Sequence, residues 1–214
     1  MSTLDDISTL LQKGKANEVK ANVQKALDEG IGAKSILEDG LMAGMNIIGG
    51  KFKRNEVYVP EVLIAARAMN AGLEPLKPHL ASAGVKSKGT VVIGTVKGDL
   101  HDIGKNLVRM MMEGKGLKVV DLGVDVSSDK FVAAAKEHNA DIVCCSALLT
   151  TTMTEMKNVV ESIKNSGIRD KLTIMVGGAP ITDSFCKSIG ADIYSADAAS
   201  AADAAVIACE KKSA

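Results

Sequence analysis

The residues most able to do chemistry in this chain lie in the segment Asp99–Gly104, which reads Asp-Leu-His-Asp-Ile-Gly. An apolar, β-rich stretch (90–96) precedes it and a helix-like stretch (103–114) follows it. A histidine at the end of a parallel strand lies at the edge where open α/β sheets bind ligands. Asp99 could accept a hydrogen bond from one ring nitrogen of His101 and leave the other nitrogen to bind a metal. Gly104 would let a bulky ligand approach the backbone closely.

Two further short segments follow this one in the sequence, and each also comes at the end of a strand-like run. Ser146-Ala147-Leu148 begins after 41 intervening residues (105–145), and Gly177-Gly178 follows Leu148 after another 28 (149–176). Each comes just after a β-like run, over residues 140–145 and 172–176. The carboxyl ends of three strands should therefore line one crevice.

The elements that must position these residues fall into two parts, which we predict to be domains over residues 1–84 and 90–214. Apolar residues recur at helical spacing over 4–11 and 19–27, closed by Gly14 and Gly30, and again over 36–52. Pro60 opens a fourth helix over 61–76. Short connections predict an antiparallel four-helix bundle. Residues 81–89 are small, polar and unpatterned, which indicates a linker.

The second part alternates between strand and helix patterns. Strand-like runs occur at 90–96, 117–122, 140–145, 172–176 and 191–194. This alternation predicts an α/β fold with a doubly wound, parallel, five-stranded sheet of the Rossmann-like (flavodoxin-like) kind. The first loop, Val96-Lys97-Gly98-Asp99, lacks the G-x-G-x-x-G pattern, so we expect no nicotinamide cofactor.

Composition removes several classes of function. The 26 basic and 26 acidic residues cancel, which argues against a nucleic-acid partner. The N-terminus lacks the basic and apolar regions of a signal peptide, and no apolar run approaches the ~20 residues of a membrane helix. We therefore expect a cytoplasmic protein with no membrane partner. The four cysteines (Cys144, Cys145, Cys186 and Cys209) lack metal-ligand spacing and are predicted to be small buried hydrophobes.

D-x-H-x-x-G, S-x-L and G-G in this order and spacing resemble the cobalamin-binding signature of B12-dependent methyltransferases and mutases. Residues 38–49 and 52–60 resemble the helical cap of cobalamin-dependent methionine synthase. Overall, the chain is most similar to the small corrinoid proteins of methylamine, methanol and methoxyaromatic methyltransfer systems. The resemblance covers nearly the whole chain, with both domains in the family's order.

This resemblance implies a cofactor, cobalamin or another cobamide (methylcob(III)amide and cob(I)amide), and a role for each site residue. His101 would be the lower axial cobalt ligand in place of the cofactor's own base, and Asp99 and Thr152 would form a relay to it. In the run of three threonines the register could slip by one, to Thr151. The lower face of the corrin and the nucleotide tail would contact Gly98, Asp99, Leu100, Asp102, Ile103, Gly104, Ser146, Leu148, Thr150, Gly177 and Gly178.

The same resemblance places Phe52 and Val59 against the upper face of the corrin; the alternative is that both are ordinary bundle core. Glu38 and Ala198 match two peripheral contacts. The implied function is that of a methyl carrier, not catalytic alone, served by a donor-specific methyltransferase, an acceptor methyltransferase acting on a thiol or tetrahydrofolate, and a corrinoid reductive activase. Two alternatives are the cobalamin-binding subunit of an adenosylcobalamin-dependent mutase and a B12-dependent regulator. The methyl donor stays open among methylamines, quaternary amines, methanol and aryl methyl ethers.

Overall fold

The computed structural model describes residues 2–213, with side chains up to residue 211. The chain divides into two compact units. We call Met1–Lys86 together with Gly114–Gly116 the helical unit, and Ser87–Glu113 together with Leu117–Ala214 the sheet unit. Each has a buried core of its own.

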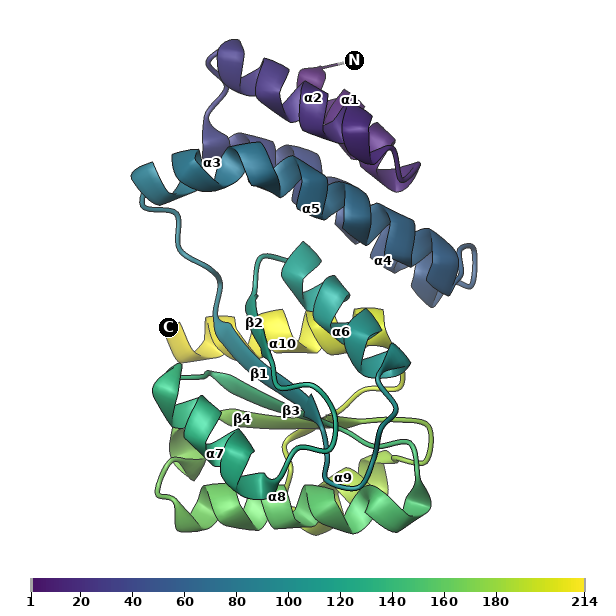
Figure 1. Cartoon of the computed structure of the whole chain (residues 1–214), viewed down its shortest axis with the longest axis vertical. Helices are drawn as coiled ribbons and strands as arrows, with labels where there is room; N and C mark the ends of the chain where they lie inside the picture. The colour runs from purple at the N-terminus through teal and green to yellow at the C-terminus, as the bar shows by residue number, and fades with distance from the viewer. Residues whose placement is uncertain (1, 214) are drawn as a thin grey trace. The chain divides into compact units, whose positions relative to one another are not determined.

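The helical unit consists of antiparallel helices joined by short turns (Figure 1). A capping box at Ser2 opens the first helix: its hydroxyl accepts from the Asp5 N–H, and the Asp5 carboxylate accepts from the Ser2 N–H. Gly14 and Gly30 both have positive φ, as expected for residues that end helices. The elements are α1 (Thr3–Gln12), α2 (Ala16–Asp28), α3 (Ala33–Ser35), the π-helix η1 (Ile36–Met42), α4 (Ala43–Lys53) and α5 (Val59–Ser82). Because α3, η1 and α4 follow one another without a break, they count as one helix, and the four predicted helices are confirmed in number and order.

The predicted third helix is interrupted internally. Instead of one α-helix over 36–52, the chain runs through α3, η1 and α4 without leaving helical geometry. A β-carbon on Gly40 would lie 3.2 Å from Cγ2 of Ile7, so η1 approaches α1 closely at this point. π-turns are rare and are maintained by packing. The apolar pattern does not distinguish them from an α-helix.

The fourth helix is longer than predicted at both ends. It includes Ala81 and Ser82, which the sequence assigned to the linker, and two internal prolines, Pro75 and Pro78. Each proline removes one helical hydrogen bond. The helix continues because its buried face, which includes Leu76, packs along α2.

The sheet unit has five parallel strands in the order β2-β1-β3-β4-β5, as predicted for a flavodoxin-like fold. The strands are β1 (Thr90–Thr95), β2 (Lys118–Asp121), β3 (Ile142–Ser146), β4 (Thr173–Gly177) and β5 (Ile193–Tyr194). Ser146 and Gly177 are the last paired residues of β3 and β4, whereas the sequence placed them just after the strands. The register pairs Thr95 with Ser146 and Ser146 with Gly177, so three strands end side by side.

Helices cover both faces of this sheet (Figure 1). The helices α6 (Ile103–Gly114) and α10 (Ala198–Ser213) lie on one face, and α7 (Ser128–Glu137), α8 (Met153–Asn165) and α9 (Asp183–Ile189) on the other. Short 3-10 turns, η2 (Thr150–Thr152) and η3 (Arg169–Lys171), precede α8 and β4. Between the layers lie large buried side chains such as Phe131, Met156 and Ile163. Because the strand order reverses between β1 and β3, this fold places its ligand site at their carboxyl ends.

All four cysteines are buried thiols, as predicted. Burial raises the pKa of Cys145 to about 12, and burial with the neighbouring thiols raises the pKa of Cys144 further. Across the described residues, no helix combines the length and apolar character needed to cross a membrane.

Candidate ligand-binding site

The loop that follows β1 makes a tight turn before α6. The Asp99 N–H donates to the carbonyl oxygen of Val96 at 3.2 Å, and Gly98 has a φ of 79°, which an L-residue rarely adopts. The Thr95 hydroxyl, fully buried, donates to the carbonyl oxygen of His101 at 2.9 Å. The turn therefore brings Asp99 back under the sheet edge and leaves His101 at the surface.

The carboxylate of Asp99 joins two loops. Its side chain is fully buried. Oδ1 accepts from the His101 backbone N–H at 3.1 Å and lies 2.7 Å from His101 Nδ1. Oδ2 accepts from the Leu148 N–H at 2.8 Å, the Leu149 N–H at 3.2 Å and the Thr152 hydroxyl at 2.8 Å. One side chain thus connects the histidine loop after β1 with the loop after β3.

These hydrogen bonds fix the charge of Asp99. Burial by itself would raise the pKa of Asp99, since it disfavours the charged form. Donation from Leu148, from the ring and backbone of His101 and from Thr152 outweighs burial and holds the pKa well below its usual range. Asp99 is therefore ionised at neutral pH and acts purely as an acceptor.

An ionised Asp99 determines the tautomer of His101. The neutral ring must donate from Nδ1 to the carboxylate, so Nε2 carries the free lone pair. Within residues 2–213, Nε2 has no hydrogen-bond partner, and the side chain is 51% exposed. The hydrogen bond expected between Asp99 and the ring is present, and Nε2 is available to a ligand.

Thr152, rather than Thr151, faces Asp99. Thr152 is buried, while Thr150 and Thr151 are exposed on the same 3-10 turn. The Thr152 hydroxyl also lies 2.9 Å from the carbonyl oxygen of Leu149, so its single proton has two acceptors, of which the carboxylate is the stronger. The order His101, Asp99, Thr152 that the sequence suggested is present as a hydrogen-bonded chain.

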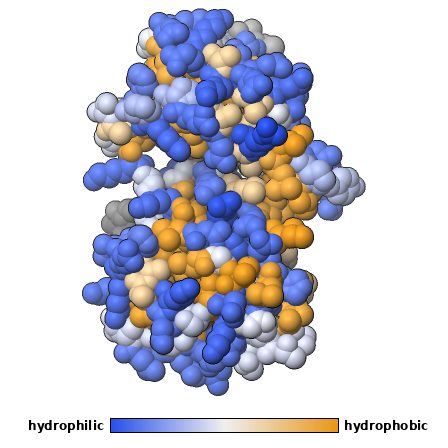
Figure 2. All heavy atoms as spheres, viewed as in Figure 1, coloured by the Kyte–Doolittle hydropathy of each residue, from blue (hydrophilic) through white to orange (hydrophobic). Residues whose placement is uncertain are grey.

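Four exposed apolar side chains lie on or next to the two loops that Asp99 joins. Leu100 is 71% and Ile103 75% exposed, and Leu148 and Leu149 are 43% and 40% exposed. In Figure 2, hydrophobic side chains reach the surface in several places among hydrophilic ones. Leu100 and Ile103 are close to His101 in the sequence, and Leu148 and Leu149 donate backbone N–H groups to Asp99, so we call these four side chains the apolar patch. Such a patch indicates a broad apolar ligand.

Metal chemistry at this patch would need a metal that brings its other ligands. In the described part of the chain, no group of three or more His, Cys, Asp or Glu side chains could hold an ion. His101 can offer one nitrogen.

The glycines differ in what they do. A β-carbon on Gly104 would meet nothing within 4 Å, and one on Gly177 would meet only the Ser195 carbonyl oxygen, at 3.7 Å. Both positions would therefore accept a β-carbon without a close contact, and Gly177 pairs with the half-buried Ser146 at the end of the sheet. A β-carbon on Gly178 would lie 1.8 Å from the carbonyl oxygen of Ala147, so the fold itself requires that glycine.

Two residues near the site, Leu149 and Lys105, were not predicted from the sequence. Leu149 supplies a backbone N–H to Asp99, and the Lys105 ammonium lies 2.6 Å from both carboxylate oxygens of Asp121. Lys105 is nearly fully buried on the first turn of α6, and the ion pair fastens that turn to the end of β2. Burial alone would raise the pKa of Asp121, but donation from Lys105 and Gly123 lowers it. A lysine on the apolar face of a helix was the available hint.

The remaining predicted residues take no part in the hydrogen-bonded chain of His101, Asp99 and Thr152. Asp102 is exposed and accepts from the Asn106 side chain at 2.9 Å, and Ala198 is buried at the start of α10. On the helical unit, Phe52 and Val59 are half-buried, at the end of α4 and the start of α5. Glu38 is exposed in η1, 4.0 Å from the Lys34 ammonium. Their roles toward a ligand stay predictions.

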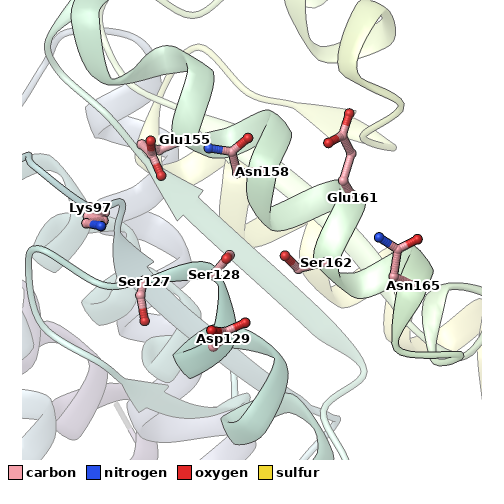
Figure 3. Close-up of a pocket in the computed structure, with 9 residues that line it drawn as sticks. All are labelled: Lys97, Ser127, Ser128, Asp129, Glu155, Asn158, Glu161, Ser162 and Asn165. Carbon is pink, nitrogen blue, oxygen red and sulfur yellow. The ribbon is translucent and has the colours of Figure 1, made fainter.

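A hollow elsewhere on the sheet unit is lined by polar and charged side chains. It measures about 450 Å³ and opens between α7 and α8 (Figure 3). Apart from Lys97 on the loop after β1, its side chains come from α8 and from the start of α7. They are polar or charged and include none of the predicted site residues: Lys97, Ser127, Ser128, Asp129, Glu155, Asn158, Glu161, Ser162 and Asn165.

Comparison with known families matches both parts of the chain. Residues 89–207 match the model of a B12 binding domain, and residues 3–77 match a second model of the same description. The trimethylamine corrinoid protein 1 of Methanosarcina acetivorans is 46% identical over 180 residues, covering 83% of each chain. The dimethylamine corrinoid protein of Methanosarcina barkeri is 43% identical over 199 residues, covering 92% of this chain and 93% of the relative.

A comparison with solved structures also finds a similar chain. A chain in the crystal structure of the methanol:cobalamin methyltransferase complex from Methanosarcina barkeri matches with a TM-score of 0.85 at 31% identity. The match covers 96% of this chain and 80% of that chain.

Proposed function

Because the chain belongs to the family of corrinoid proteins built on B12 binding domains, we propose that it carries a methyl group between two methyltransferases. The chain binds a cobamide, as the family does. The observation at the site that best supports the proposal is the free Nε2 of His101, which lies within an exposed apolar patch.

His101 and its partners supply the protein's part of the chemistry. A cobamide, when bound, supplies a cobalt atom that accepts and releases the methyl group. His101 keeps one proton at Nδ1, shared with Asp99, and offers Nε2 as a ligand in place of the cofactor's own base. Thr152 steadies the carboxylate by donating to Oδ2.

The nucleotide tail would use the open space along the ends of β3 and β4. Gly177 would leave that space, and Ser146 and Thr150 would offer hydroxyls to the tail. Gly98, Leu100, Asp102, Ile103, Gly104 and Leu148 would contact the lower side of the corrin. Phe52 and Val59 would cover its upper side, with Glu38 and Ala198 at the periphery.

The partners follow from the carrier role. Two relatives are named as trimethylamine and dimethylamine corrinoid proteins, and the similar solved chain belongs to a methanol:cobalamin methyltransferase complex. We propose a donor-specific methyltransferase, with a methylamine as the first substrate to test ahead of quaternary amines, methanol and aryl methyl ethers. An acceptor methyltransferase acting on a thiol or tetrahydrofolate, and a reductive activase, complete the set.

Histidine ligation is tested with cob(II)alamin as the probe. Electron paramagnetic resonance of the loaded wild type should show nitrogen superhyperfine coupling, and 15N-labelled histidine should change that pattern. The change with label identifies histidine as the nitrogen donor rather than the cofactor's base. His101→Ala should bind cobalamin with the label effect lost. A label effect that persists in His101→Ala would show that another histidine is the ligand.

The carrier role is tested by reconstitution. Cobalamin-loaded protein alone should not demethylate trimethylamine, dimethylamine or methanol, nor methylate a thiol. Turnover should require both a donor-side and an acceptor-side methyltransferase from a related system. Turnover by the chain alone would make it an enzyme, and adenosylcobalamin-dependent isomerisation with a barrel subunit would favour the mutase alternative.

A further inference from the structure

The loop between β2 and α7 lies alongside the segment that carries Asp99. Among the described residues, four hydrogen bonds join residues 123–126 of this loop to residues 95–99. Three use only backbone groups: Thr95 N–H to Gly123 O at 3.0 Å, Val126 N–H to Thr95 O at 3.0 Å, and Asp125 N–H to Asp99 O at 3.0 Å. In the fourth, the Asp125 carboxylate accepts from the Gly98 N–H at 2.7 Å. Of these four, it alone depends on a particular side chain.

Asp125 therefore holds the turn from both sides. Its carboxylate binds the N–H of Gly98, and its own N–H binds the carbonyl oxygen of Asp99, the next residue. The Thr95 hydroxyl fixes the carbonyl oxygen of His101 two residues further along. Together these bonds determine where the Asp99 side chain starts, and hence whether it can meet Leu148, Leu149 and Thr152.

The backbone of Asp125 shows that this arrangement has a cost. Asp125 has a φ of 52°, in the left-handed region that aspartate tolerates better than most residues. Glycine would adopt the same φ without strain but would lose the carboxylate. The position thus combines a strained backbone with an acceptor directed at the histidine loop, a combination typical of residues retained for a site.

We propose that Asp125 is a positioning residue that holds the Asp99–His101 pair in place for ligation. The proposal deepens the proposed function, because its consequence for the cofactor assumes that His101 is the ligand. Its structural part concerns the chain alone and can be tested without cofactor. Asp125 acts through its hydrogen bonds to Gly98 and Asp99.

The first test measures amide hydrogen exchange in the unloaded protein. The reporters are the Leu148 and Leu149 amides, which bind Asp99 and are not bonded to Asp125. Asp125→Gly should raise their exchange rates about tenfold, the effect expected of one lost hydrogen bond transmitted through Asp99. Asp125→Asn keeps an acceptor and tolerates the same φ, so it should retain protection close to wild type.

Asn139 provides a matched control in the same unit. It is exposed, has a φ of 47° and lies on the turn before β3, at the opposite end of that strand from the site. Asn139→Gly should leave the Leu148 and Leu149 amides unchanged. Wild-type protection of both amides in Asp125→Gly would overturn the proposal. Loss of protection spread evenly over β1, β3 and β4 would also overturn it, because Asp125 would then be a general fold residue.

The second test uses cob(II)alamin and 15N-labelled histidine. Wild type and Asp125→Asn should show one histidine-coupled spectrum, whereas Asp125→Gly should show a mixture with a smaller histidine-coupled fraction. A wild type without histidine coupling would refute the proposed ligation whatever Asp125 does. Full coupling in Asp125→Gly, with coupling present in wild type, would refute the positioning role alone.

Discussion

At the scale of single residues, Asp99 is the hydrogen-bond acceptor shared by the residues of the site. Both of its oxygens are used by donors from His101, Leu148, Leu149 and Thr152. A carboxylate serves here better than an amide because it presents acceptors in every direction and has no N–H of its own. The same residue sets the tautomer of His101 and ties two loops together.

Asp99→Asn should therefore destabilise the protein in a pH-dependent way. The amide turns an N–H₂ group toward at least one buried donor, so we expect a loss of roughly 2–4 kcal/mol near neutral pH. The pKa of Asp99 is lowered on folding, so its contribution is complete above the unfolded value of about 3.9 and is lost as pH falls through the folded value. The gap between wild type and variant should be widest at neutral pH and should narrow below about pH 4.

Urea unfolding at a series of pH values measures this gap. Asp170→Asn is the control, since Asp170 is exposed on η3 and should show little difference at any pH. A gap that stays constant down to pH 3, or that widens, would contradict the assignment of Asp99 as an ionised acceptor.

At the scale of elements, three strand ends in register form the frame of the site. Gly177 and Gly178 are neighbours at one of these ends but have different surroundings. Gly178→Ala places a β-carbon 1.8 Å from a backbone oxygen at a φ of 135°, so we expect a loss of roughly 2–6 kcal/mol in the unloaded protein. Gly177→Ala has ordinary contacts and should change stability by no more than about 1 kcal/mol.

Gly177→Ala, which should affect stability little, is the variant expected to affect cofactor binding. Gly177→Ala should weaken cobalamin binding about tenfold or more while the fold stays intact, since the added methyl group occupies space proposed for the tail. Thermal unfolding and cobalamin titration of both variants provide the comparison. Unchanged affinity in Gly177→Ala would move the tail away from the end of β4.

The sequence predicted the types and order of these elements well, because their apolar periods are strong. The histidine loop and the helix from Ile103 to Gly114 are confirmed as predicted. The π-turns around Gly40 and the continuation of α5 past Leu76, through Pro78, were not predictable from pattern, because tertiary packing maintains them. Asp125 was missed for a similar reason: its importance lies in a φ value and a contact 27 residues away.

At the scale of the whole molecule, the two units are joined by a short polar segment. Between the end of α5 and the start of β1, Lys86 and Lys88 are exposed and lie outside helices and strands. Brief trypsin treatment should therefore cut first at these lysines, because loop sites are cleaved before sites within elements. Intact-mass spectrometry would identify the fragments.

The released C-terminal fragment should keep its structure, since the sheet unit has its own core. Circular dichroism and thermal unfolding of the purified fragment measure this. A fragment that unfolds cooperatively supports independent folding, and one that is unfolded after cleavage would show that the sheet depends on the helical unit. First cuts within α1–α5 would contradict the linker assignment.

The burial of the cysteines has a consequence for the proposed transfer of a methyl group. A methyl group on its way between enzymes is an electrophile, and thiolates are good acceptors for it. Cys144 and Cys145 lie in β3 just before Ser146, yet burial raises their pKa and keeps them as weakly nucleophilic thiols. In the proposed role these two thiols would be poor acceptors for the methyl group, so the choice of where the group goes would be left to the partner that collects it.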